Sequence, residues 1–157
     1  MAEPPVTGNT DHRRRSRARR RAIQALYQWQ LTANDMVGIR QATLDDCDLG
    51  AFDAEYFGEL LHRIPIMVGE LDALIEPWLD RPLTTIDPVE KAILRLGAFE
   101  LLERIEVPYR VVLNEAVELA KVFGAEQSHR YINGVLDRVG RQLSRRVAEL
   151  GQPDARH

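Results

Sequence analysis

Residues 87–105 read DPVEKAILRLGAFELLERI, and this stretch decides the fold class. Asp87 can accept hydrogen bonds from the free N–H groups of a first helical turn, and Pro88 suits the first helical position. Glu90 stands where a capping-box acid reaches back to the start of the helix. The apolar residues that follow lie on more than one side of a helix, a pattern typical of a central helix surrounded by others.

The flanking sequence repeats apolar residues at helical spacing and contains no period-two strand pattern of any length. We therefore predict an all-α protein, a helical bundle of about six to seven helices. The expected helices cover residues 12–33, 36–44, 52 to a kink or end at Pro65, 67–79, the central helix up to Val107-Pro108, a helix ended by Gly124 as a left-handed cap, and a last helix marked by apolar residues from Ile132 to Val147. Asn133-Gly134 resembles a hairpin turn, but the surrounding spacing places it within the last helix.

The length of 157 residues fits one domain of ordinary size. Residues 1–11 have no apolar periodicity and include Pro4, Pro5 and Gly8, so we expect a disordered tail there. Residues 12–150 are expected to form a single helical domain. The composition of residues 80–86 predicts a hinge that divides this domain into sub-bundles of about 12–80 and 84–150.

Seven arginines lie between residues 13 and 21, at the start of the first expected helix. Residues 1–21 carry a net charge of +5 and the remaining residues a net charge of −8. Self-repulsion makes such a cluster costly unless it stays solvated or meets a polyanion such as RNA or DNA. A solvated tail with incidental affinity for polyanions remains an alternative on composition alone.

Several function classes find no support in the sequence. Cys47 is the only cysteine, so an intrachain disulfide is excluded, a cysteine-based zinc site cannot be formed by cysteine alone, and a reducing compartment is favoured. No stretch approaches the ~20 apolar residues of a membrane span, and a secretory signal is absent. The four histidines stand in no metal-binding spacing, and catalytic motifs are absent. We therefore expect a cytoplasmic protein that is not an enzyme and has neither cofactor nor metal.

Five segments, taken together in order and spacing, point to a known family. They are residues 24–31 (QALYQWQL), 89–95 (VEKAILR), 107–111 (VPYRV), 114–121 (NEAVELAK) and 123–137 (FGAEQSHRYINGVLD). With the arginine run, this arrangement strongly resembles the bacterial transcription antitermination factor family NusB, over roughly residues 13–147.

The resemblance implies an all-α fold of two helical sub-bundles and a role in transcription antitermination. It implies binding to boxA RNA, a single-stranded element of ribosomal RNA leaders, together with NusE, a small-subunit ribosomal protein. The pair would join RNA polymerase and other Nus factors to suppress premature termination. Some family members form homodimers, so a homodimer is possible, and no membrane partner is implied.

The resemblance also implies an RNA-binding surface and a partner surface. Arg15, Arg17 and Arg19 match the RNA-contacting positions best, and Glu90 lies on the helix expected to face NusE. The other residues expected at the RNA surface are Arg14, Arg20, Arg21, Tyr27, Trp78, Lys121, Gln127, Arg130 and Tyr131. Relatives often have Tyr at the position of Trp78, Phe at that of Tyr131 and an acid at that of Gln127.

Position alone leaves alternatives open for several of these residues. Tyr27 and Tyr131 stand beside apolar stripes and suit a core as well as an RNA surface, and the core interpretation is favoured for Trp78. Lys121 could be a solvated helix end, and capping alone explains Glu90. At the level of function, a helical protein–protein adaptor with a basic tail is the main alternative. A tRNA- or ribosome-associated enzyme without known motifs is a more distant one.

Overall fold

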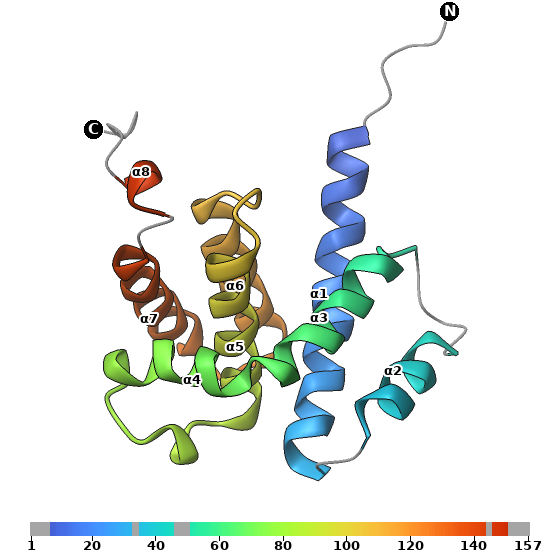
Figure 1. The fold of residues 1–157 in the computed structure, drawn as a ribbon, viewed down its shortest axis with the longest axis horizontal. Coiled ribbons are helices and arrows are strands. Elements are labelled where there is room, and N and C mark those ends of the chain that lie inside the picture. The colour runs from blue at the N-terminus through green and yellow to red at the C-terminus, as the bar shows by residue number, and fades with distance from the viewer. Residues whose placement is uncertain (1–6, 33–34, 46–50, 144–145, 151–157) are drawn as a thin grey trace, which may run out of the picture. The chain divides into compact units, whose positions relative to one another are not determined.

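The computed structural model of the chain describes residues 7–32, 35–45, 51–143 and 146–150, and within these ranges it contains helices and no strand. Figure 1 shows their order along the chain. The helices are α1 (Thr7–Thr32), α2 (Met36–Leu44), α3 (Ala54–Ile66), α4 (Val68–Ile75), α5 (Pro88–Glu103), α6 (Tyr109–Phe123), α7 (Ser128–Gln142) and α8 (Val147–Leu150), with short 3-10 helices η1 (Glu76–Trp78) and η2 (Leu83–Thr85). The predicted all-α class is confirmed.

Helix α1 begins at Thr7, five residues before the expected start. The predicted disordered tail is therefore wrong for residues 7–11, and residues 1–6 lie outside the described part of the chain, as does Cys47. Helix α2 matches its expected bounds, with Asp35 accepting a hydrogen bond from the Val37 N–H at 3.2 Å. Helix α3 continues one residue beyond Pro65, and α4 starts after Met67.

The chain divides into two compact units between Pro65 and Ile66, not within residues 80–86 as the sequence suggested. We call them the N-terminal unit, up to Pro65, and the C-terminal unit, from Ile66. The boundary lies before α4, and not after it, because α4 packs on α5 and α7. A half-buried, two-pronged ion pair also joins α4 to α5, with Arg95 Nε and Nη2 each 2.8 Å from an Asp72 carboxylate oxygen.

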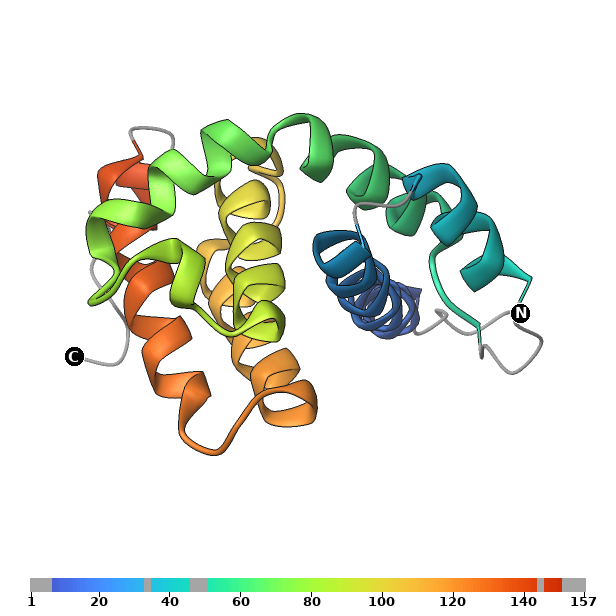
Figure 2. The same cartoon turned by 90° about the horizontal axis from the view of Figure 1, so that it is seen from below.

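In the C-terminal unit, α5, α6 and α7 pack on one another, and α4 lies against this group (Figures 1 and 2). Helix α5 is central, as its sequence predicts, because nine of its 16 residues are buried. Asp87 caps it by accepting from the N–H groups of Val89 and Glu90 at 2.8 and 3.4 Å. Gly97 lets α7 approach closely, since a Cβ there would stand 2.5 Å from Leu136 Cδ1.

The turn between α6 and α7 differs from the expected left-handed glycine cap. Gly124 has an extended backbone with φ −89° and ψ 175°. Glycine is needed there for space, since a Cβ would stand 2.5 Å from Ser128 Oγ and 2.8 Å from the Ala120 carbonyl oxygen. The left-handed residue is instead Gln127, with φ 76°, immediately before α7.

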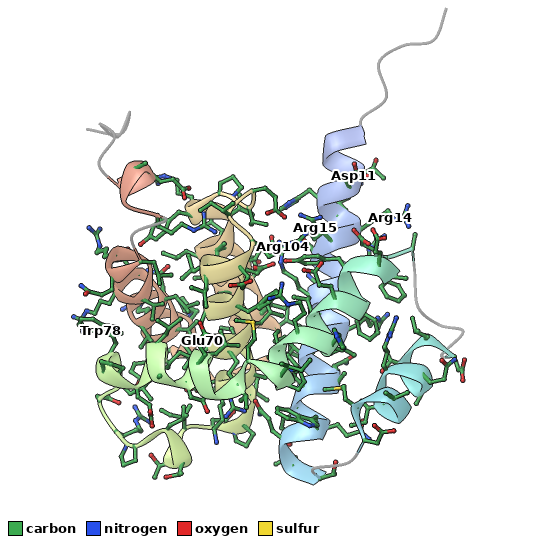
Figure 3. The ribbon with its side chains drawn as sticks, viewed as in Figure 1. Asp11, Arg14, Arg15, Glu70, Trp78 and Arg104 are labelled. Atoms are coloured by element: carbon green, nitrogen blue, oxygen red, sulfur yellow. The ribbon has the colours of Figure 1, made fainter. Side chains whose placement is uncertain are left out.

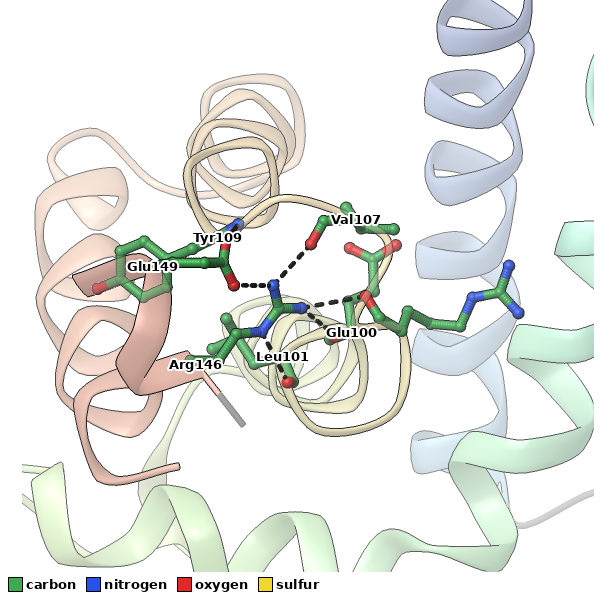
Figure 4. A network of polar contacts seen from close by, with 7 residues as sticks. Glu100, Leu101, Val107, Tyr109, Arg146 and Glu149 are labelled. Atoms are coloured by element: carbon green, nitrogen blue, oxygen red, sulfur yellow. Dashed lines mark hydrogen bonds and ion pairs between the residues drawn. The ribbon is translucent and has the colours of Figure 1, made fainter. Parts of the chain in front are cut away.

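The predicted last helix ends at Gln142, and a separate helix, α8, begins at Val147. Arg146, which is fully buried, precedes α8 and binds the C-terminal end of α5 and the turn after it (Figure 4). Its guanidinium donates to the carbonyl oxygens of Glu100, Leu101, Arg104 and Val107 at 2.8–3.1 Å. It also pairs with Glu149 at 2.7 Å, and Glu149 accepts from the Tyr109 N–H at 2.8 Å. We call this network the C-terminal clasp. The network adds a charged donor to carbonyl groups of the last turn of α5 and of the turn that follows, where helical hydrogen bonding ends.

Candidate nucleic-acid interface

The arginine run forms the middle of α1, where helical geometry spreads its side chains around the axis. Four of the seven are exposed, two are half-buried and one is buried. The exposed residues are Arg13, Arg14, Arg17 and Arg20, the half-buried ones are Arg15 and Arg21, and the buried one is Arg19. The run therefore presents an exposed basic face and also contributes to the packing of the N-terminal unit.

Arg14 and Arg17 contact the backbone that leads into α3. The Arg14 side chain donates to the Phe52 carbonyl oxygen at 3.3 Å, and the Arg17 side chain donates to the Ala51 carbonyl oxygen at 2.9 Å. The Arg14 carbonyl oxygen accepts from the Asp53 N–H at 3.0 Å. Figure 3 shows Arg14 and Arg15 on α1. These contacts use only part of each guanidinium, which carries five N–H donors.

Arg15 and Arg19 lie one helical turn apart, and both contact the ring of Tyr56 on α3. Their guanidinium carbons stand 4.3 and 5.5 Å from the ring centroid, within the range of a cation–π interaction. Tyr56 is 2% exposed and Arg19 only 1% exposed. The side chain of Arg19 therefore lies in the core, which leaves little of its surface for the RNA contact that was predicted. The i,i+4 spacing of the two arginines was the available signal for a shared partner, but Tyr56 itself was missed.

Tyr27 lies further along α1 and remains 38% exposed, so it is a rim residue rather than a core residue. Leu31, one turn later, is 55% exposed. An exposed ring on the same helix as the arginines can offer a flat surface to an unstacked base. The exposure of Tyr27 is thus compatible with its predicted role, which stays a prediction.

In the C-terminal unit, the N-terminal turn of α7 meets the segment after η1. The half-buried Tyr131 donates its hydroxyl hydrogen to Asp80 Oδ1 at 3.0 Å and accepts from the Asp80 N–H at 3.3 Å. Arg81 pairs with Asp80 at 2.8 Å, and its guanidinium carbon lies 5.1 Å from the centroid of the Tyr131 ring. Sequence reasoning missed Asp80 and Arg81, because nothing local links them to a residue about 50 positions away.

The groups of this cluster shift one another's pKa values. The hydrogen bonds from Arg81 and then Tyr131 lower the pKa of the Asp80 carboxyl. Burial raises the pKa of the Tyr131 hydroxyl, the hydrogen bond from the Asp80 N–H opposes that effect, and the Asp80 carboxylate adds to it. At neutral pH the cluster thus holds an ionised carboxylate, a guanidinium and a neutral phenol.

The remaining predicted residues of the C-terminal unit lie near both ends of the α6–α7 turn or on η1. Gln127 and Arg130 are exposed at the start of α7, and Lys121 is exposed on α6, 3.7 Å from the Glu118 carboxylate. Trp78 on η1 is half-buried, so it is not the fully buried core residue that the sequence favoured (Figure 3). Helix η1 packs on α7, and Asp80, two residues after Trp78, contacts Tyr131 near the start of α7.

Glu90, the predicted partner contact, lies half-buried in the first turn of α5. Burial, followed by repulsion from Asp87, raises the pKa of its carboxyl, and the charge of Arg81 opposes that effect. Glu90 is therefore electrostatically coupled to the Asp80–Arg81–Tyr131 cluster.

The arrangement is suited to binding anions and flat rings. Within the described ranges no group of three or more His, Cys, Asp or Glu side chains is placed to hold a metal ion. In the same part of the chain no helix is long and apolar enough to cross a membrane. Guanidinium groups and exposed rings together are the groups that single-stranded nucleic acids require.

Comparisons with solved structures agree with this fold. NusB from T. maritima superposes with a TM-score of 0.72 at 28% identity, over 90% of this chain and 94% of that chain. The NusB component of a solved complex of the antitermination factors NusB and NusE with double-stranded RNA superposes with a TM-score of 0.76 at 27% identity. That match covers 83% of this chain and 98% of the other.

Curated relatives are closer in sequence. The transcription antitermination protein NusB of Halorhodospira halophila is 54% identical over 151 residues, which cover 96% of this chain and 97% of the relative. That of Alkalilimnicola ehrlichii is 48% identical over 166 residues, covering 95% and 93%. The model of the NusB family matches residues 16–141. The predicted resemblance is confirmed, and the chain belongs to the NusB family.

Proposed function

We propose that this protein is a transcription antitermination factor that binds boxA-type RNA of ribosomal RNA leader transcripts together with NusE. In this role it suppresses premature termination by RNA polymerase in the bacterial cytoplasm, acting with other Nus factors. The proposal describes a binding protein and assigns it no reaction of its own. The observation that carries it is the exposed arginine face of α1 in a chain of the NusB family.

The contacts that each arginine makes within the protein determine which of its N–H donors are available to RNA. Arg13 and Arg20 are exposed and offer their donors to phosphates. Arg14, Arg15 and Arg17 also hold the N-terminal unit together, through backbone carbonyls and the Tyr56 ring. We assign the buried Arg19 a supporting role, in which it orients Tyr56 and leaves the direct RNA contacts to its neighbours.

We also assign RNA contacts to the C-terminal unit. Its surface offers two aromatic rings, an amide group and two basic side chains, which belong to Trp78, Tyr131, Gln127, Lys121 and Arg130. We assign Glu90 to the NusE surface. The acidic balance of the chain outside its first 21 residues, a net charge of −8, favours a basic ribosomal protein as the partner.

RNA titrations at several salt concentrations test the proposal. A labelled boxA-type single strand should bind more tightly than a scrambled strand, and NusE should tighten binding of the boxA strand further. Replacing Arg13 or Arg20 with Gln should reduce the slope of log affinity against log salt by about 0.7 for each phosphate that the variant no longer neutralises. Point variants are preferable to deleting the arginine run, because α1 also packs against the backbone before α3.

Arg110→Gln is the matched control, since Arg110 is an exposed arginine at the start of α6, the end of that helix away from the α6–α7 turn. It should leave the salt slope unchanged. A duplex of the same sequence serves as a third ligand, because a solved NusB–NusE complex contains double-stranded RNA. Equal affinity for the boxA and scrambled strands, with and without NusE, would contradict the proposal and favour the protein–protein adaptor.

A further inference from the structure

The ring of Tyr131 is not fully open to an approaching base. The guanidinium of Arg81 lies over it at 5.1 Å from the centroid, so one ring face is covered. Arg81 in turn is fixed by two hydrogen bonds to the Asp80 carboxylate, from Nε at 2.8 Å and from Nη2 at 3.3 Å. A base that approaches this face meets the guanidinium before it meets the ring.

The cluster is restrained by several hydrogen bonds within the C-terminal unit. Asp80 holds the Tyr131 hydroxyl with one carboxylate oxygen and receives Arg81 with both. The Tyr131 hydroxyl also accepts from the Asp80 N–H, which ties α7 to the segment after η1. The guanidinium is therefore preorganised, although the side chains of Arg81 and Asp80 are 49% and 62% exposed.

Exposure of this kind argues against a purely structural role. An exposed ion pair contributes little to folding stability, because water and salt screen it. A planar cation held above an aromatic ring is, however, well suited to nucleic acid. Arginine stacks on flat rings through its plane and also supplies N–H donors, whereas lysine offers only a point charge.

We propose that Arg81 contacts RNA directly, with an unpaired base stacking on the outer face of its guanidinium, and that Asp80 is the positioning residue that holds it over Tyr131. This inference deepens the proposed function and rests on it. It replaces a single stacking ring with a layered platform of base, guanidinium and phenol.

Binding of a labelled boxA-type single-stranded RNA to the full-length chain tests the platform. Arg81→Ala should weaken binding about 5- to 150-fold, the range expected for losing one base–side chain stack. Arg81→Lys keeps the charge and loses the plane, so it should recover only a minor part of that loss. Arg110→Ala, which removes an equal charge from the start of α6, away from the α6–α7 turn, should change affinity less than about twofold.

A double-variant comparison distinguishes one platform from two contacts. If Arg81 and Tyr131 form one stack, the variant carrying Arg81→Ala and Tyr131→Ala should lose little more than the larger of the single losses. Thermal unfolding of each variant shows whether the fold is retained, and Tyr131→Phe supplies a ring variant that keeps the stacking surface.

Three outcomes would overturn the inference while leaving the proposed function intact. They are unchanged binding by Arg81→Ala, full recovery by Arg81→Lys, and additive losses in the double variant. Failure of the unmodified protein to bind the boxA strand in preference to a scrambled one, with or without NusE, would instead overturn the proposed function, and the inference with it.

Discussion

Tyr109 joins three elements of the C-terminal unit through one residue. It begins α6, its hydroxyl donates to the Asp137 carboxylate of α7, and its N–H donates to Glu149 of α8. Its ring also lies against Gly140, where a Cβ would collide with it. Burial, followed by the hydrogen bond to Asp137, raises the pKa of the Tyr109 hydroxyl well above its usual value.

This raised pKa predicts a loss of stability at alkaline pH. The folded state holds the Tyr109 proton more tightly than the unfolded state, whose pKa is about 10. The stabilisation is therefore complete below about pH 10 and is lost as pH rises from there through the folded-state pKa. Tyr109→Phe should cost about 1 kcal/mol at pH 7, from the lost hydrogen bond, and should flatten the decline above pH 10. Urea unfolding at pH 7, 9 and 11 measures both effects, and parallel declines in the two proteins would contradict the assignment.

At the scale of an element, two glycines of α7 have opposite roles. Gly134 has open space at the Cβ position, so Gly134→Ala should stabilise the protein by about 0.5–1 kcal/mol through helix propensity. Gly140 faces the Tyr109 ring, so Gly140→Ala should destabilise by about 1–3 kcal/mol through overpacking. Each variant is the control for the other, because the chemical change and the helix are the same. Chemical unfolding measures the difference, and equal effects would show that α7 does not pack as described.

The C-terminal clasp gives a second prediction at this scale. Arg146→Ala removes the donor shared by four carbonyl oxygens at the end of α5 and in the turn before α6. Because buried acceptors would lose a charged partner, we expect a loss of at least about 3 kcal/mol in the free energy of unfolding. Arg138→Ala, an exposed arginine on α7, should have little effect on the same denaturation curve. A small loss in the Arg146 variant would mean that residues 146–150 do not secure this helix end.

At the scale of the whole molecule, the charge distribution suits two ligands of opposite sign. The first 21 residues carry a net charge of +5 and the rest of the chain a net charge of −8. We expect RNA and NusE to bind to separate surfaces and to enhance each other. The coupling must be reciprocal, so each ligand raises the affinity of the other by the same factor.

Glu90→Gln tests this two-surface arrangement while preserving the shape of the side chain. It should weaken NusE binding more than RNA binding by the isolated protein, because Glu90 reaches the proposed RNA surface only through its charge interaction with Arg81. Because Glu90 lies in the first turn of α5, helicity must be measured alongside by circular dichroism. Glu106→Gln, an exposed acid of the same unit, is the matched control. Competition between NusE and RNA would show that the surfaces overlap.

The sequence by itself determined most of the helices and the basic character of α1, because both depend on residues that are near neighbours in the chain. The start of α5 follows from Asp87 and Pro88, and the bounds of α2 follow from local spacing. The five family segments can also be recognised directly in the sequence, by their composition and order. These features allowed the fold class, the family and most of the candidate RNA surface to be predicted.

Only the tertiary structure decided which arginines remain available and which residues surround Tyr131. Arg19 is buried because Tyr56, 37 positions later, lies against it. Asp80 meets Tyr131 across 51 positions, and Arg95 meets Asp72 across 23, which moves the division of the chain to Pro65. Such contacts depend on how helices pack, and the local periodicity that predicts a helix does not encode its neighbours.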